Sequence, residues 1–417
     1  MENKLFSRNF TLLILGQASS LFGNCILDFA MSMYVLEVTG SAAVFAGFLA
    51  AAMLPTILLS PLGGVLADRA NRRKIMMLLD LASGIIVLLT AFLIDRGNNL
   101  VIIGVALIIM SILGAFETPT VQACIPQMQS GGNIVRANAV VNQISALSML
   151  IGPFAGSLVY TAFGLKTVMY AGGVCFLVTA GLEYFIRLDD VPSKEKEGIW
   201  NIIKGDLTVS AQFICKKTPA ILKTLLLTAV IGFFIQGTAV VGLPYIVRTV
   251  LGLGAGYYGA AESVLSFAGI LGSIIAGLAA AKFSIGRLYL PLAGIGLFLI
   301  PISIVFSIQS GVYVRYAVLM LSFSVIQILA SIFSIFALSV IQQLTPENMT
   351  GKVMAYAASF SLCIQPLGQM IYGVLFDKFT DSVYWVILPT GVILSLIGIG
   401  TKKFFGNVEM QLAEEMK

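Results

Sequence analysis

Residues 64–74, GVLADRANRRK, decide the fold of this chain. An apolar run over residues 42–66 ends here in a cluster of charges, and a second apolar run begins directly after it. The cluster consists of Asp68, Arg69, Arg72, Arg73 and Lys74. Two hydrophobic segments joined by so short a basic connection predict an antiparallel pair of membrane helices that turns on the cytoplasmic side.

The composition indicates similar segments along the whole chain. Of 417 residues, 58% are hydrophobic and 11% are charged, which is more apolar surface than a water-soluble protein of this size buries. Each crossing of a bilayer needs about 20 residues. We predict an all-α membrane protein with twelve transmembrane helices, near residues 10–37, 42–66, 75–94, 100–122, 137–160, 166–187, 220–247, 256–281, 288–308, 312–340, 353–376 and 383–404.

The basic residues predict the orientation of these helices. With both termini on the cytoplasmic side, 20 of the 25 Lys and Arg residues lie in inner loops and tails. The outer side keeps Arg96, Lys166, Arg248, Arg315 and Lys378. This asymmetry follows the positive-inside rule. The net charge of +5 is therefore a topology signal, and we expect no nucleic-acid partner.

The order of residue types in the opening stretch, G-x-L-A-D-R-x-x-R-R/K, resembles the loop between transmembrane helices 2 and 3 of the major facilitator superfamily. That family has Gly where this chain has Asn71, a residue that also tolerates a left-handed turn. The resemblance implies the major facilitator fold, in which the twelve helices form two pseudo-symmetric six-helix bundles.

The resemblance also implies a gating role for this stretch. Asp68 would face the N-terminus of the helix expected at 353–376, where the helix dipole favours a carboxylate. This would make a latch on the order of a few kcal/mol that stabilises an outward-open state. The alternative is a charge cluster that only holds the loop in the cytosol. The residues of the gating motif are Gly64, Asp68, Arg69, Arg72, Arg73 and Arg136.

The second half of the chain repeats the first. A shift of 213 residues carries residues 64–69, GVLADR, onto residues 277–282, GLAAAK, and carries Pro153 onto Pro366. A parallel repeat of this kind is expected of the two halves of a transporter. The predicted parts are an N-terminal six-helix bundle over 1–187, a cytoplasmic linker with an amphipathic helix over 188–218, and a C-terminal six-helix bundle over 219–417.

Polar residues on the first and fourth expected helices mark a candidate cavity. Gln17, Asn24 and Asp28 lie within about 40° of one another on helix 10–37, and a polar seam in a membrane faces protein or water. An ionised carboxylate at Asp28 costs several kcal/mol, so this side chain takes up a proton easily. The alternative for Asp28 is a packing hydrogen bond. Glu117, beside Pro119, is either a cavity site or a partner at the kink.

The seventh and tenth expected helices carry further polar residues. Gln236 lies on the seventh, and Gln327 and Ser331 belong to a polar seam on the tenth. In the family fold, helices 1, 4, 7 and 10 line the central cavity, although a serine seam also serves helix packing. Glu262 and Arg315 either pair as an outer gate or are unrelated interfacial charges.

The fifth expected helix contains Gly152, Pro153 and Gly156. The two glycines form a small face that lets a neighbouring helix approach closely. The pattern resembles the helix-5 motif G-x-x-x-G-P-x-x-G-G of the superfamily's antiporters, with Ser148 and Ser157 at its first and last glycines. Ordinary packing glycines explain part of the same pattern.

Several function classes are excluded by what the sequence lacks. There are no histidines, and the five cysteines are scattered, which argues against a metal site, disulfides and Ser-His-Asp catalysis. There is no P-loop and no catalytic constellation. We expect no enzyme activity, no cofactor and no metal.

The stretch over residues 9–42, NFTLLILGQASSLFGNCILDFAMSMYVLEVTGSA, followed by the gating motif, resembles the macrolide-efflux branch of drug–proton antiporters. That resemblance implies proton-coupled efflux of hydrophobic or amphipathic small molecules by alternating access. The alternatives are a lysophospholipid or other lipid transporter and a siderophore exporter of the same fold, or a membrane sensor or channel. We expect a monomer in a prokaryotic plasma membrane, with protons, lipid bilayer and a small-molecule or lipid-like substrate as its partners.

Overall fold

The computed structural model describes residues 5–130, 132–188, 214, 218–280, 283–308, 310–346 and 349–415, without the side chains of Asp68, Arg69, Gly132, Gly351, Lys352, Ala355 and Glu415. The linker predicted over 188–218 therefore lies almost wholly outside the described residues. The described residues form helices and contain no strand. Short π-helical and 3₁₀ segments lie between some of the helices.

The long helices are α1 (Arg8–Thr39), α2 (Ala42–Arg69), α3 (Arg72–Leu93), α4 (Asn99–Met128), α5 (Gly132–Tyr184), α7 (Pro219–Ile235), α9 (Ala255–Ala279), α12 (Val312–Gln343), α13 (Thr350–Lys378), α14 (Tyr384–Gly400) and α15 (Lys402–Glu415). The shorter segments are η2 (Gln236–Gly242), α8 (Leu243–Tyr245), η3 (Ile246–Val250), η4 (Ile285–Arg287), α10 (Tyr289–Leu297), α11 (Leu299–Ser307) and η5 (Thr380–Ser382).

Eleven helical stretches of the described chain are long and apolar enough to cross a membrane. One of them, within α5, contains two crossings. Its 52 residues would span nearly 80 Å at about 1.5 Å per residue, against a hydrocarbon layer of about 30 Å. Gly164 interrupts α5 with φ +75° and ψ 173°. The described residues therefore make twelve crossings, so the chain is a multi-pass membrane protein and the predicted fold class is confirmed.

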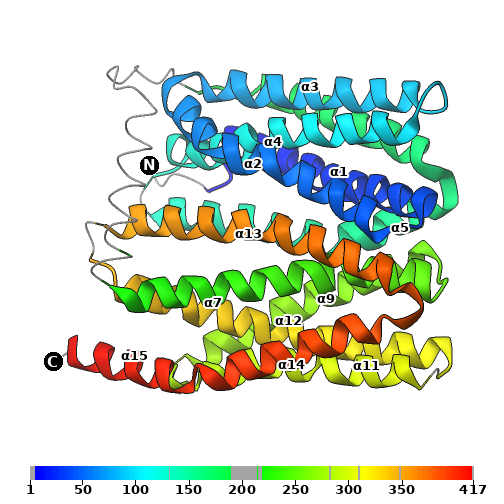
Figure 1. The fold of residues 1–417 in the computed structure, drawn as a ribbon. Helices are drawn as coiled ribbons and strands as arrows, with labels where there is room; N and C mark the ends of the chain where they lie inside the picture. The colour runs from blue at the N-terminus through cyan, green and yellow to red at the C-terminus, as the bar shows by residue number, and fades with distance from the viewer. Residues whose placement is uncertain are drawn as a thin grey trace. The chain divides into compact units, whose positions relative to one another are not determined.

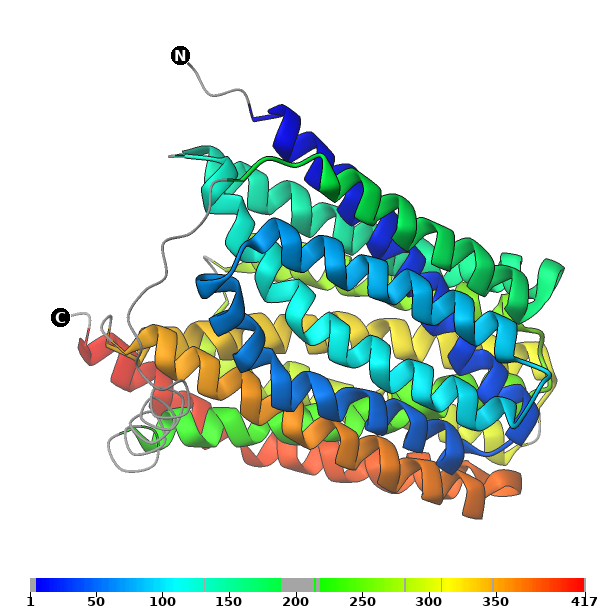
Figure 2. The ribbon, with the colours of Figure 1, turned by 90° about the horizontal axis from the view of Figure 1, so that it is seen from above.

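The chain divides into two compact units that do not follow the sequence halves. The first unit comprises residues 1–38, 51–202 and 255–263, and the second comprises 39–50, 203–254 and 264–417. In the first unit α3 packs against α4 and α5, and in the second α14 packs against α10 and α11 (Figure 1). Seen from above, α3 and α4 run side by side (Figure 2).

Asn71 begins α3 as its N-cap. Its backbone is extended, with φ −67° and ψ 105°, and its side-chain Oδ1 accepts a hydrogen bond from the Lys74 amide at 3.1 Å. This is the usual geometry of an Asn cap, which satisfies one of the free amides in the first helical turn. Asn71 therefore does not use the left-handed conformation that Asn tolerates, and it serves the following helix as its cap.

The first turn of α2 is capped by a carboxylate from a distant part of the sequence. Asp377, at the end of α13, accepts hydrogen bonds from the Ser41 hydroxyl at 2.5 Å, the Ala42 amide at 2.6 Å and the Ala43 amide at 3.1 Å. All four residues belong to the second unit. The free amides and the positive end of the helix dipole both favour an anion at this position.

Candidate functional site

A cavity of about 630 Å³ lies within the second unit, between α7, α9, α12 and α13. It holds three of the predicted cavity residues, Gln236, Gln327 and Ser331. Its other polar lining residues are Thr228, Ser273, Ser334, Ser361 and Gln365. No lysine, arginine, aspartate or glutamate is among the described residues that line it. The cavity therefore offers neutral hydrogen-bonding groups on an apolar wall.

Three glutamines form a hydrogen-bonded chain at this cavity. Gln236 donates to the Gln365 side-chain oxygen at 3.0 Å, and Gln369 donates to the Gln236 side-chain oxygen at 2.9 Å. Gln236 starts the π-helical segment η2, and π-helical turns are frequent at functional sites. Sequence reasoning missed Gln365 and Gln369, although their spacing of four residues places them on one face of α13.

The first unit holds a buried group of carboxyls. Ser20 lies 3.1 Å from Asp80 and 3.3 Å from Glu117, measured from its hydroxyl oxygen. Asp80 and Glu183 interact electrostatically with each other. Gln17 interacts with Glu117. We call Asp80, Glu117 and Glu183 the carboxyl cluster; their exposed fractions are 0%, 9% and 1%.

Close helix packing brings the carboxyl cluster together. Gly16 of α1 approaches Thr179 and Glu183 of α5, and a Cβ at Gly16 would lie 3.2 Å from the Thr179 methyl carbon. Sequence reasoning found Gln17 and Glu117 but missed Asp80 and Glu183. The available signal was that any acid within a membrane helix is a candidate functional residue.

Asp28 is more exposed than the residues of the carboxyl cluster. Its side chain is exposed, and Asn24 one turn earlier is half-buried. Cys25 lies close enough to both Asp28 and Glu262 for electrostatic interaction. The predicted roles of Asp28 and Asn24 stay predictions.

Glu262 and Arg315, the predicted outer gate, each contact another residue. Glu262 accepts a hydrogen bond from the Tyr258 hydroxyl at 2.7 Å, and Tyr258 stacks on Phe29 with ring centroids 5.3 Å apart. The Arg315 guanidinium lies over the Phe306 ring at 5.6 Å. Glu262 belongs to the first unit and Arg315 to the second. A gate formed by the two stays a prediction.

The gating motif is described in part. The side chains of Asp68 and Arg69 lie outside the described residues, so the structure says nothing of the predicted latch. Arg72 donates to the Ala67 and Ala123 carbonyl oxygens at 2.7 and 2.8 Å, which ties the ends of α2 and α4 together. Two further arginines of the gating motif are described. Arg73 donates a hydrogen bond to the Tyr184 carbonyl oxygen, and the Arg136 side chain is exposed.

The small face of α5 packs against α1. A Cβ at Gly152 would lie 2.5 Å from the Cys25 Cβ, and one at Gly156 would lie 3.4 Å from the Phe29 Cβ. The glycines therefore allow close approach of the two helices. Whether Gly152, Pro153 and Gly156 act as an antiporter motif stays a prediction.

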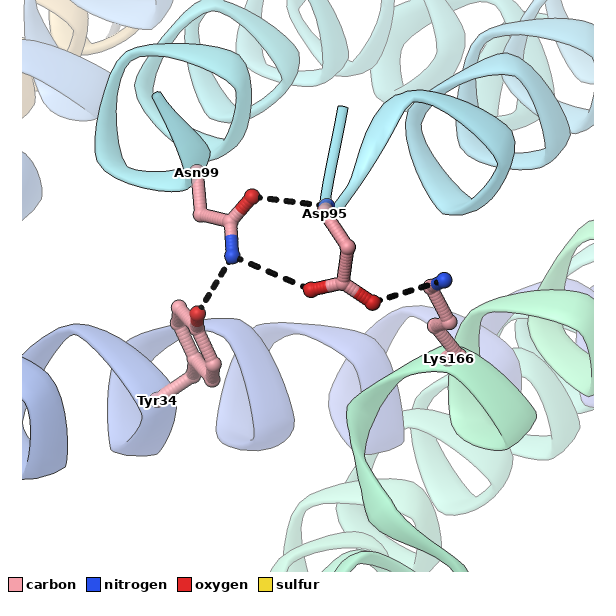
Figure 3. A network of polar contacts seen from close by, with 4 residues as sticks. All are labelled: Tyr34, Asp95, Asn99 and Lys166. Carbon is pink, nitrogen blue, oxygen red and sulfur yellow. Dashed lines mark hydrogen bonds and ion pairs between the residues drawn. The ribbon is translucent and has the colours of Figure 1, made fainter. Parts of the chain in front are cut away.

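A polar network fixes the connection between α3 and α4 (Figure 3). Asn99 donates to the Tyr34 hydroxyl at 2.8 Å and accepts from the Asp95 amide at 2.9 Å, and Asp95 pairs with Lys166 at 2.8 Å. The hydrogen bond from Lys166 lowers the pKa of Asp95, with a smaller contribution from Asn99. The network joins α1, α4 and the second half of α5 to Asp95, which lies in the connection between α3 and α4.

These features define a membrane transporter, and comparison with known proteins gives the family. Residues 13–368 match the sequence profile of the Major Facilitator Superfamily, so the chain belongs to this family. It is 30% identical over 181 residues to macrolide efflux protein A of Streptococcus pyogenes. That match covers 42% of this chain and 44% of the relative, so it spans less than half of the relative's length.

Other matches span nearly the whole chain. A putative bacilysin exporter, BacE, of Bacillus subtilis is 24% identical over 406 residues, covering 94% of each protein. The crystal structure of the nucleoside transporter NupG has a TM-score of 0.74 at 12% identity, covering 94% of this chain and 99% of that one. A bacterial homologue of the iron transporter ferroportin in an inward-facing state has a TM-score of 0.73 at 15% identity, covering 95% and 98%.

Proposed function

We propose that this protein is a proton-coupled exporter of hydrophobic or amphipathic small molecules. The observation that carries the proposal is that the carboxyl cluster and the uncharged cavity lie in different units. Asp28, Glu262 and the carboxyl cluster belong to the first unit, whereas the cavity of the second unit has no charged lining residue among those described. Carboxyls in a membrane suit proton binding, and a neutral, mainly apolar cavity suits cargo without a fixed charge.

The relatives support the direction of transport. Macrolide efflux protein A and the putative bacilysin exporter are named for export. In the proposed cycle, two six-helix bundles, over 1–187 and 219–417, alternate their access around the cargo site while both termini stay in the cytoplasm. The linker over 188–218 joins the bundles.

The test is transport in proteoliposomes with an imposed pH gradient and a panel of macrolides, cationic dyes and lysolipids. We expect uphill movement of at least one macrolide or dye that collapses when the gradient is dissipated. Transport of lysolipids alone would support the lipid-transporter alternative, and transport that ignores the pH gradient would contradict proton coupling.

Two variants connect this assay to the residues. Gln236→Ala breaks the glutamine chain at the cavity and is expected to weaken cargo binding at least tenfold. Gln343→Ala is the matched control, because Gln343 is exposed and bonds to Ser339 of its own helix at 2.8 Å. Asp28→Asn is expected to lose gradient-driven uphill transport while it keeps downhill exchange. Equal behaviour of Gln236→Ala and Gln343→Ala would contradict the cargo site.

A further inference from the structure

We propose that a second cavity of the second unit binds the headgroup of a phospholipid that carries both a phosphate and a primary ammonium group, as phosphatidylethanolamine does. The cavity has a volume of about 280 Å³ and shares no described lining residue with the cavity that holds Gln236. We call it the interface pocket. Because it is separate from the proposed cargo site, the proposal is independent of the cargo and of proton coupling.

The interface pocket lies at the ends of membrane-crossing helices. Its walls include Phe306 and Ser307 at the end of α11, Arg315 in the first turn of α12, Asp381 in η5 and Tyr384 at the start of α14. Three candidate membrane spans end or begin here, at residues 307, 312 and 384. Within the unit, α11 packs against both α12 and α14 (Figure 1). The pocket is therefore at the level of the lipid headgroups, where a bilayer meets water.

Arg315 brings a positive charge without a counter-charge to the pocket. Its Nε is buried without a hydrogen-bond partner, and no carboxylate among the described residues forms an ion pair with it. The guanidinium lies over the Phe306 ring at 5.6 Å, a contact that uses the face of the group and leaves its N–H donors for another partner. A buried donor without an acceptor is costly, and a guanidinium matches the geometry of phosphate oxygens. Arg315 therefore suits the phosphate of a headgroup.

Asp381 makes a simple anion a poor occupant. It lines the same pocket but forms no ion pair with Arg315 in the part of the chain that the structure describes. The two opposite charges therefore border a shared space without neutralising each other directly. A free phosphate is attracted by Arg315 and repelled by Asp381, whereas a zwitterion places its phosphate at the first and its ammonium at the second. A primary ammonium also donates hydrogen bonds to a carboxylate, which a trimethylated ammonium does not.

The size and surroundings of the pocket favour a lipid headgroup over a cargo molecule. Sites for drug-sized ligands occupy about 300–1,000 Å³, which is more than this pocket provides. Ile308, Tyr313 and Trp385 lie within two residues of a lining residue and are 68%, 67% and 59% exposed. Tyr and Trp are enriched at membrane interfaces, where their rings lie at the level of the headgroups. These side chains offer an apolar surface to acyl chains that stay outside the pocket.

Native mass spectrometry of the purified, delipidated protein tests the site. Phosphatidylethanolamine, phosphatidylcholine or phosphatidylglycerol with identical acyl chains is added one at a time, and the affinity for the first bound lipid is measured. We expect phosphatidylethanolamine to bind at least about fivefold more tightly than the other two. Equal affinity for the three lipids would overturn the proposal, because binding would then depend on the acyl chains alone.

Arg315→Gln is expected to weaken phosphatidylethanolamine binding at least about fivefold, because the phosphate loses its charged partner. Arg96→Gln is the matched control, since the Arg96 guanidinium also lies over a ring, that of Phe92 at 3.7 Å, but belongs to the first unit. Equal binding by the two variants would contradict the site. If Arg315→Gln does not fold, Arg315→Lys decides the point. It keeps the charge but not the planar group, so we expect weakened binding, and unchanged binding would overturn the role of the guanidinium.

Asp381→Asn separates a zwitterion site from an anion site. Without the carboxylate, phosphatidylglycerol is no longer repelled and the ammonium has no partner, so we expect this variant to bind phosphatidylglycerol as tightly as phosphatidylethanolamine. A preference for phosphatidylethanolamine that survives the substitution would overturn the assignment of Asp381. In detergent without added lipid the pocket holds no headgroup, so substitutions of Asp381 act through this site only when the lipid is present.

Soluble glycerophosphoethanolamine distinguishes a lipid from a free zwitterion. It carries the same headgroup without acyl chains, and we expect it to displace the lipid only at concentrations at least about 100-fold higher. Equal potency of the two compounds would overturn the lipid assignment in favour of a soluble zwitterion. All of these measurements report binding without transport. A protein that binds phosphatidylethanolamine but shows no proton-coupled export would therefore disprove the proposed function and leave the interface pocket standing.

Discussion

Two glycines of α5 determine how closely α1 approaches it. A Cβ at Gly152 would lie 2.5 Å from the Cβ of Cys25, a distance that side-chain rotation does not relieve because both atoms are attached to the backbone. A Cβ at Gly156 would lie 3.3 Å from the Ile26 Cα, which is tight but less severe. Gly152 is therefore the more sensitive position of the two.

We predict that Gly152→Ala destabilises the protein by about 1–3 kcal/mol, because the two helices must separate to admit the methyl group. Thermal unfolding of the purified protein measures this. Gly181→Ala is the matched control in the same helix, since no atom lies within 4 Å of its added Cβ. Equal shifts in Tm for the two variants would contradict the packing explanation.

The ion pair between Asp95 and Lys166 predicts a pH dependence. The folded protein lowers the pKa of Asp95, so the stabilisation is fully present above the unfolded pKa of about 4 and is lost as the pH falls through the lower folded value. We expect Asp95→Asn to be slightly less stable than the unaltered protein at neutral pH and equal to it in strong acid. A difference that persists unchanged at low pH would show that the pair is not its cause.

Residue-scale prediction is possible where one helix carries the whole pattern. Gln17, Asn24 and Asp28 follow from the helical period alone. The carboxyl cluster could not be predicted in this way, because Asp80 and Glu183 are isolated acids on their own helices. Their proximity to Glu117 depends on how α3, α4 and α5 pack, which no local period encodes.

At the scale of elements, the start of α2 depends on the end of α13. Asp377 accepts two backbone amides of the first turn and the hydroxyl of Ser41. The sequence shows an acid in one helix and a serine before another, and nothing in either segment indicates the contact. By contrast, the Asn71 side chain that begins α3 lies next to the helix it caps, so local sequence patterns are enough to find such caps.

Removing the carboxylate in Asp377→Ala should cost about 0.5–2 kcal/mol of stability, the usual range for loss of a helix cap. Denaturant unfolding in detergent measures the change. Asp381→Ala is the control, because Asp381 lies four residues later in η5. Hydrogen exchange at the Ala42 and Ala43 amides gives a local readout, and unaltered exchange in Asp377→Ala would refute the capping role.

At the scale of the whole molecule, the sequence predicted twelve crossings and the family fold, because hydropathy and the gating motif are local signals that recur along the chain. The division into compact units was not predicted from the sequence. The first residues of α2 and of α9 are grouped with the opposite unit from the rest of each helix, with the divisions at residues 50–51 and 263–264. Hydropathy does not reveal such a division, because the division depends on contacts between distant segments.

The latch predicted at the loop between α2 and α3 is a property of the whole transport cycle. We expect Asp68→Asn to fold and insert normally but to reduce turnover at least tenfold, because a neutral side chain no longer pairs with the surrounding arginines or a helix terminus. Turnover in proteoliposomes measures this, with expression and Tm as checks on folding. Full transport by a well-expressed Asp68→Asn variant would eliminate the latch role.

The contact between Ser41 and Asp377 joins residues 336 positions apart. During synthesis, α2 leaves the ribosome long before α13 exists, so its first amides enter the bilayer interface without their carboxylate. Water or lipid headgroups must satisfy them until the eleventh crossing is inserted. A chain truncated before Asp377 therefore leaves these amides without their carboxylate even though ten of its crossings are present.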